Sequence, residues 1–145
     1  MPILWIMLTI LLTATGLMVE RERSSSERSD SADVDVLAHN LLIYRNALAE
    51  YAYTNPGITG TPPDSALPLP NWWSHVSGVS GYVQAGSSYT YYASPPNSLV
   101  TALVELTGSL SIGYAYGGQL VSPSGGSTGV TLPAAVPNGA AVAYR

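Results

Sequence analysis

The sequence has no cysteine, no lysine and no phenylalanine among its 145 residues, and charged residues make up only 10% of it. The absence of cysteine excludes disulfides, thiol catalysis and thiolate metal sites. The absence of lysine excludes the P-loop lysine, although residues 125–129 are glycine-rich. Soluble domains ordinarily carry about 25% charged residues. The composition therefore describes a chain with few groups for ionic chemistry.

The few charged and nucleophilic groups also lack the spacing that catalysis or metal binding needs. There is no G-x-S-x-G elbow, the two histidines have no companion at i+4, and Asp64 and Glu105 are the only acids after Glu50. Outside the segment after the apolar start there is no basic patch. We therefore expect no enzymatic activity, no cofactor, no metal, no nucleic acid and no small-molecule substrate. The five cations are Arg21, Arg23, Arg28, Arg45 and Arg145.

Residues 1–19 form an uncharged, strongly apolar run. A helix of this length is about 28 Å long, close to the roughly 30 Å thickness of a bilayer's hydrocarbon core. The acidic and basic residues from Glu20 to Arg23 end the run abruptly. We predict a transmembrane anchor over 1–19, in which the membrane-contacting side chains are Leu4, Trp5, Ile6, Leu8, Ile10, Leu11 and Leu12.

Two other interpretations of this run stay open. A cleaved secretory signal would have a basic first region, which is absent, although the small residues 14–16 suit a signal peptidase. A prepilin would have its glycine and glutamate near the start of the apolar run, whereas Gly16 and Glu20 lie at its end. Counting arginines alone would place the following residues in the cytoplasm.

Residues 20–31 are polar and rich in serine, and they form either a flexible linker or a solvated continuation of a helix. The next segment has apolar residues at steps of 4, 3, 4 and 3, which predicts an amphipathic helix over 32–54. Asp30 or Ser31 would cap its start, and residues 55–57 (Asn-Pro-Gly) would end it. The apolar stripe consists of Leu37, Leu41, Tyr44, Leu48 and Tyr51.

The face of this helix opposite the stripe carries Arg45, Asn46 and Glu50. The simpler interpretation is a solvated charge pair. The alternative is a partner-contact patch, because His39 shares that side.

The remaining sequence predicts a small antiparallel sheet. A rigid proline-rich segment over 57–70 precedes a short helix over 71–76, capped by Asn71. A second helix is expected over 99–107, ended by Gly108. The fold class is α+β, with the anchor followed by a long amphipathic helix and a short helix packed on one face of the sheet, in a domain over 32–145. Strands are expected at 81–84, 88–93, 110–116, 119–121, 130–132 and 140–144.

Three aromatic residues are the predicted partner-binding residues. Trp72 and Trp73 are adjacent, so we expect one to pack inward and the other to lie on the surface, although both could be packed. Tyr91 stands in the aromatic strand SYTYYA. Aromatic side chains often dominate protein interfaces, so we select Trp72, Trp73 and Tyr91.

The chain also resembles a known family along nearly its whole length. The segments that carry the resemblance are LWIMLTILLTATGL, NLLIYRNALAEYAYTNPG, LPLPNWW, GVSGYV, TYYASPP, LVTALVELTGSLSIGYAYGGQLVSPSGG and VTLPAAVPNG. They are similar to the PilM family of type IVb thin-pilus assembly proteins. This family is distinct from the actin-like cytoplasmic PilM, whose ATP-binding fold needs a longer chain.

The resemblance implies a structural, non-enzymatic component of a pilus machine. It implies a single-pass protein of the bacterial inner membrane with its domain in the periplasm, in the pilin-transport apparatus or basal body of pili used in conjugation or adhesion. The implied partners are inner-membrane assembly proteins, pilin, or both. Two alternatives are a minor-pilin-like subunit of the fibre and a secreted binding domain with a cleaved signal.

Overall fold

The computed structural model describes residues 2–145, with the side chains of residues 2–16 and 30–145. Helix α1 (Pro2–Thr54) opens the chain. The chain divides into two compact units, Met1–Asp33 and Val34–Arg145.

In the first unit, the side chains of residues 2–16 are exposed. The hydroxyls of Thr9 and Thr13 donate to the carbonyls of Trp5 and Thr9, which gives these polar groups partners within an apolar helix. Among the described residues, no helix is long and apolar enough to span a bilayer. Residues 17–19 of the expected anchor and most of the expected linker lie outside the described side chains. The anchor therefore stays a prediction.

The expected helix start at residue 32 is wrong, because α1 is continuous from Pro2 to Thr54. Asp30 and Ser31 stand inside the helix and cap nothing. The serine-rich segment 24–31 contains no proline or glycine, so nothing in its backbone interrupts the helical hydrogen bonds. Of the two interpretations of this segment, the continued helix is the one found. The expected end is confirmed, because the helix stops immediately before Asn55.

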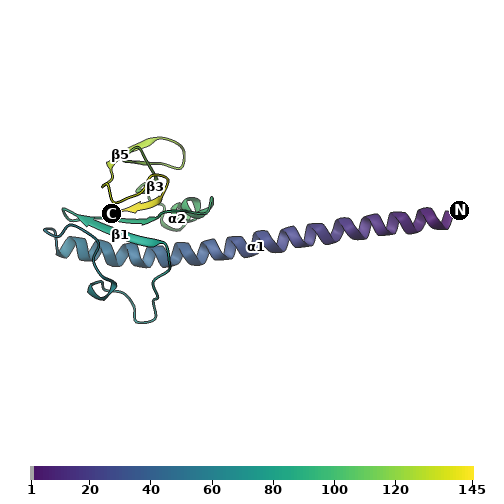
Figure 1. The fold of residues 1–145 in the computed structure, drawn as a ribbon, viewed down its shortest axis with the longest axis horizontal. Helices are drawn as coiled ribbons and strands as arrows, with labels where there is room; N and C mark the ends of the chain where they lie inside the picture. Colours follow the sequence, from purple (N-terminus) through teal and green to yellow (C-terminus); the bar gives the residue numbers. More distant parts are fainter. Residues whose placement is uncertain (1) are drawn as a thin grey trace. The chain divides into compact units, whose positions relative to one another are not determined.

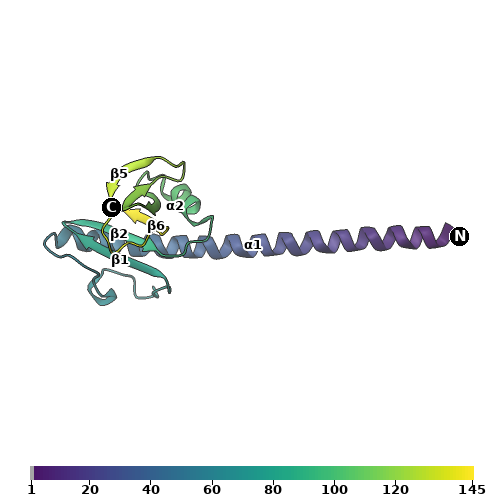
Figure 2. The ribbon, with the colours of Figure 1, turned by 45° about the horizontal axis from the view of Figure 1, so that its top comes forward.

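The second unit is a six-stranded antiparallel sheet with the packed part of α1 and helix α2 (Leu99–Thr107). The strand order is β1-β2-β6-β3-β4-β5, so the last strand of the chain lies in the middle of the sheet. Figures 1 and 2 show β1 and β2 along α1 and β5 away from it. The α+β fold is confirmed. The strands are β1 (Val79–Gln84), β2 (Ser87–Tyr92), β3 (Ile112–Tyr116), β4 (Gln119–Val121), β5 (Ser127–Thr131) and β6 (Ala141–Tyr144).

One face of the sheet packs against the helices. The predicted stripe of α1 supplies Leu41, Tyr44 and Leu48, which are fully buried. Leu41 packs with Leu103 of α2 and residues of β3 and β6, and Tyr44 and Leu48 pack against β1. Because successive strand residues point to opposite faces, Tyr89 and Val142 belong to a third cluster, on the other face.

Tight glycine turns set two of the hairpins. Gly117 and Gly118 join β3 to β4 with φ of 58° and 76°, the left-handed pair that a two-residue hairpin turn needs. The turn between β1 and β2 has the same form, with Ala85 at φ 51° and Gly86 at φ 81°. Gly108 closes α2 in the left-handed conformation, as expected.

The expected helix over 71–76 is wrong. Asn71 and Trp72 form a turn, and residues 73–76 have no regular structure. Trp73 and His75 instead pack against Tyr44 of α1, and Asn40 of α1 holds the carbonyl of Ser74. These tertiary contacts outweigh the weak capping signal at Asn71.

Candidate partner-binding surface

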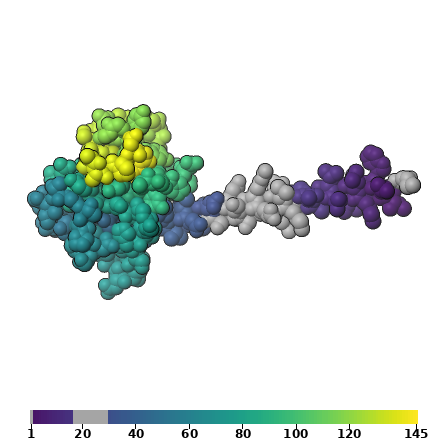
Figure 3. Space-filling model, viewed as in Figure 1, coloured from purple at the N-terminus to yellow at the C-terminus, as the bar shows by residue number. Residues whose placement is uncertain are grey.

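The most unusual surface feature of the second unit is the segment from Gly57 to Gly78, called here the connector. Only Pro62 and Leu67 are buried in it, and its single element is the 3-10 turn η1 (Asp64–Ala66). The space-filling view shows its teal atoms on the surface, away from the yellow and green C-terminal strands (Figure 3).

The connector covers the outer edge of β1. Gly60 and Val83 exchange two backbone hydrogen bonds, with N···O distances of 2.9 and 2.8 Å. The hydroxyl of Thr61 donates to the carbonyl of Gly81 at 2.8 Å, and His75 Nε2 donates to the carbonyl of Val79 at 2.7 Å. An unpaired strand edge can pair with other chains. Contacts from the connector therefore block this edge without a seventh strand.

The two tryptophans diverge, as one of the two sequence interpretations predicts. Trp73 is half-buried and stacks on Tyr44, with 5.7 Å between ring centroids and 24° between ring planes. Trp72 is 74% exposed. A large aromatic ring standing this far out of a surface with few charges is a candidate anchor for a protein partner.

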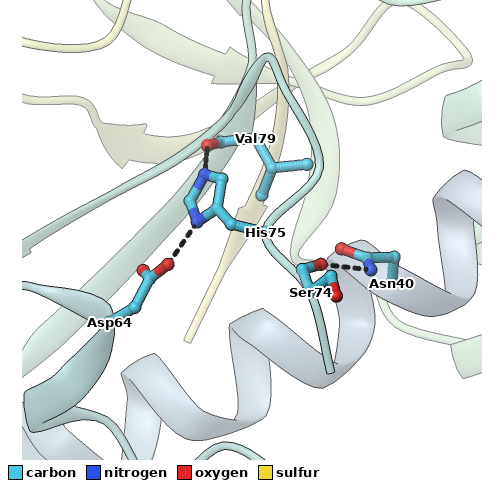
Figure 4. Close-up of polar contacts among 5 residues, drawn as sticks. All are labelled: Asn40, Asp64, Ser74, His75 and Val79. Carbon is cyan, nitrogen blue, oxygen red and sulfur yellow. Dashed lines mark hydrogen bonds and ion pairs between the residues drawn. The ribbon is translucent and has the colours of Figure 1, made fainter. Parts of the chain in front are cut away.

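His75 and Asp64 join two parts of the connector (Figure 4). His75 Nδ1 lies 2.8 Å from Asp64 Oδ2. The ring also meets Tyr44 and Trp73 edge-on, with centroid distances of 5.6 and 5.5 Å. Nearby, Asn40 Nδ2 donates to the carbonyl of Ser74 at 3.2 Å. Figure 4 shows the Asp64 and His75 side chains pointing toward one another.

Tyr44 is the buried centre of this arrangement. Its ring crosses β1 at Gly81, where an added Cβ would lie 2.7 Å from Tyr44 Cε1. Burial raises the pKa of Tyr44 to about 12, and the negative charges of Asp64 and of ionised Tyr91 add to the rise. The phenol therefore remains neutral at physiological pH.

Tyr91 does not join the tryptophans. It packs against the cluster on the sheet face that carries Tyr89 and Val142, whereas Trp73 packs in the cluster between α1 and β1. The structure thus places Trp73 and Tyr91 in two separate clusters, and of the three predicted interface residues only Trp72 is largely exposed.

The expected solvated position of Arg45 is wrong. Arg45 is only 9% exposed, and its Nη2 donates to the carbonyl of Tyr144 at 3.4 Å. Burial lowers the pKa of Arg45, and the positive charge of Arg145 lowers it further. The helix turns Arg45 toward the end of β6.

The neighbouring polar residues of α1 do remain outside. Asn46 accepts a hydrogen bond of 3.1 Å from Arg145 Nη1. Asn46, Glu50 and Arg145 help to line an open pocket of about 440 Å³. His39 does not line it, so the patch that the sequence suggested is only partly assembled.

Sequence reasoning missed the pairing of His75 with Asp64. The two residues are eleven positions apart in a segment without periodicity, so no spacing rule connects them. The only available signal was the chemistry of a histidine and an acid in one proline-rich stretch. Among the described residues, no group of three histidine or acidic side chains is close enough to bind a metal ion.

The fold defines a small α+β domain that follows an apolar helical segment. The model of the PilM family matches residues 7–144, and the chain therefore belongs to the PilM family.

Solved structures are also similar to the chain. A PilM protein from Pseudomonas aeruginosa 2192 is 47% identical with a TM-score of 0.52, and the match covers 78% of this chain and 93% of that one. A PilM protein from Escherichia coli B7A has a TM-score of 0.62 at 24% identity, covering 80% of this chain and 94% of that one, which speaks for the fold alone. Among curated proteins there is no match.

Proposed function

We propose that this protein is a non-enzymatic, membrane-anchored component of a type IVb pilus machine. Its apolar first segment holds it in the bacterial inner membrane, and its α+β domain lies in the periplasm. There the domain contacts pilus assembly proteins or pilin. The observation that carries the proposal is the PilM family match, which extends over both the apolar segment and the domain.

The chemistry of the described residues supports a binding role. The domain exposes Trp72 on a connector in which few residues are buried and in which Asp64 is the only acidic residue or arginine. Contacts of this kind depend on burying aromatic area rather than on pairing charges. We therefore place the main partner contact at the connector, with Trp72 as its anchor.

Cell fractionation tests the location. Full-length protein is expected in the inner-membrane fraction, resistant to alkaline carbonate and sensitive to protease only after the outer membrane is opened. Mass spectrometry should find an N-terminus at Met1 or Pro2. A mature chain starting at Leu17 in the soluble periplasmic fraction would contradict the anchor.

Site-specific photo-crosslinking tests the contact. A photoreactive phenylalanine analogue is placed at Trp72 and, as a matched control, at Tyr116, which is 71% exposed on the β3–β4 hairpin. In cells assembling pili we expect position 72, and not 116, to crosslink to a pilus assembly protein or to pilin. Equal crosslinking at both positions would contradict the placement of the partner contact at the connector.

A minor-pilin-like subunit is the second candidate, because α1 is continuous from the apolar segment into the domain core. Pili sheared from cells separate the two candidates. Recovery of the protein in the purified fibres would favour the minor pilin, and its retention in the inner membrane would favour an assembly component.

A further inference from the structure

The two oxygen atoms that His75 faces differ in how well they suit each form of its ring. The carbonyl of Val79 can only accept, so Nε2, at 2.7 Å, must carry a hydrogen. The ionised carboxylate of Asp64 can also only accept, so Nδ1, 2.8 Å from Oδ2, must carry a second hydrogen. Both contacts exist together only when the ring is the doubly protonated imidazolium. Either neutral tautomer keeps one of the two hydrogen bonds. At the other contact the lone pair of the ring nitrogen then faces a lone pair of the acceptor oxygen, and the two atoms repel each other.

Among the side chains that the structure describes, Asp64 is the only charged partner of the ring. From α1 the facing titratable group is Tyr44, whose phenol is neutral at ordinary pH. From β1 the ring meets a backbone carbonyl, and from the connector it also meets the uncharged ring of Trp73. Arg45, next to Tyr44 in sequence, donates instead to the carbonyl of Tyr144.

His75 makes two of the polar contacts that hold the later part of the connector, together with the Asn40–Ser74 hydrogen bond and the stacking of Trp73 on Tyr44. The remaining backbone and hydroxyl bonds to β1 come from Gly60 and Thr61, near the start of the segment. Between Thr61 and His75 only Pro62 and Leu67 are buried. Segments with so few buried groups open more readily than the core of a domain.

We propose that His75 and Asp64 form a proton-dependent clasp, which closes the connector over the edge of β1 when His75 is protonated and loosens it when the proton leaves. Because Trp72 lies in the same connector, opening of the clasp frees the segment that carries the proposed partner contact. This regulatory role rests on the proposed function. The contribution of the clasp to closure is present at lower pH and lost as the pH rises, because the imidazolium is the form that both acceptors require.

The test is carried out on the full-length protein in detergent micelles. Nitrogen-15 NMR of the imidazole rings reports their protonation, and hydrogen exchange of the Gly60 and Val83 amides, corrected for intrinsic rates, reports closure. Between pH of about 5.5 and 8.5, the range over which histidine side chains change charge, we expect protection of these amides to fall roughly threefold. The change is modest because His75 and Asp64 are 38% and 43% exposed and water screens the pair.

Three variants make the result specific. In Asp64→Asn the amide can donate to a lone pair on Nδ1, so neutral His75 satisfies both contacts and protection should persist at high pH. In His75→Gln the pH dependence should disappear. The matched control is His39→Gln, which alters the other histidine of the chain, an exposed ring on the carbonyl of Asp35. This control should keep the full pH dependence.

Two outcomes would overturn the clasp. One is protection that does not vary with pH in the native protein, and the other is an Asp64→Asn variant with the native pH profile. Neither measurement involves pili. Failure of crosslinking at Trp72 would therefore contradict the proposed contact at the connector while leaving the clasp intact, and the reverse also holds.

Discussion

At the residue scale, neighbours in sequence have opposite environments. Trp72 and Trp73 are adjacent, yet one is exposed and the other stacks on Tyr44. Sequence alone predicted that they would diverge but not which one would pack inward. That choice depends on Tyr44 and His75, which lie far from each other in the chain and meet only after folding.

Tyr44 also makes the domain sensitive to alkali. Its folded-state pKa of about 12 exceeds its ordinary value of 10.0, so folding favours the neutral phenol. This stabilisation is fully present below a pH of about 10 and is lost as the pH rises toward about 12. We expect Tyr44→Phe to lose less stability than the native protein between a pH of about 8 and about 11, measured by urea unfolding.

The native protein and the variant must be compared at both pH values, because Tyr44→Phe also removes a hydroxyl. Burial raises the pKa of Tyr89 as well, so Tyr89→Phe is the matched comparison and should reduce the alkaline loss less. An alkaline loss in Tyr44→Phe equal to that of the native protein would show that this phenol is not responsible.

At the element scale, local patterns predicted most of the secondary structure. Helix α2 has the expected bounds, and the β3–β4 hairpin turns at the expected glycines, because these signals act within a few residues. The failures were the start of the amphipathic helix and the short helix over 71–76. In the first case no breaker stood in the sequence, and in the second case tertiary contacts decided.

Strand β1 depends on the small size of Gly81. An added Cβ would lie 2.6 Å from Leu48 Cδ2 and 2.7 Å from Tyr44 Cε1, so α1 would have to move away from the sheet. We expect Gly81→Ala to destabilise the domain by about 1–3 kcal/mol, measured by chemical denaturation. The control Gly57→Ala, where nothing lies within 4 Å of the added atom, should change stability by less than about 0.5 kcal/mol. Equal effects would mean that α1 is not packed against β1 as described.

At the scale of the whole molecule, the three buried clusters found among the described side chains all lie within the second unit, Val34–Arg145. The folding of the domain should therefore not need the apolar segment. A chain lacking residues 1–29 is expected to unfold cooperatively, with a Tm within about 4 °C of the full-length protein, a shift that corresponds to less than about 1 kcal/mol for a domain of this size. Circular dichroism melting measures this, and loss of cooperativity would show that the first unit contributes to the fold.

The sequence by itself determined the apolar first segment, the amphipathic stripe of α1, helix α2, the strands and the family, because each depends on nearby residues or on a pattern spread along the chain. Tertiary structure decided what depends on distant residues meeting. It set β6 in the middle of the sheet, turned Arg45 inward, separated Tyr91 from the tryptophans and brought His75 to Asp64. Such contacts follow from chain topology and packing, which no local periodicity encodes.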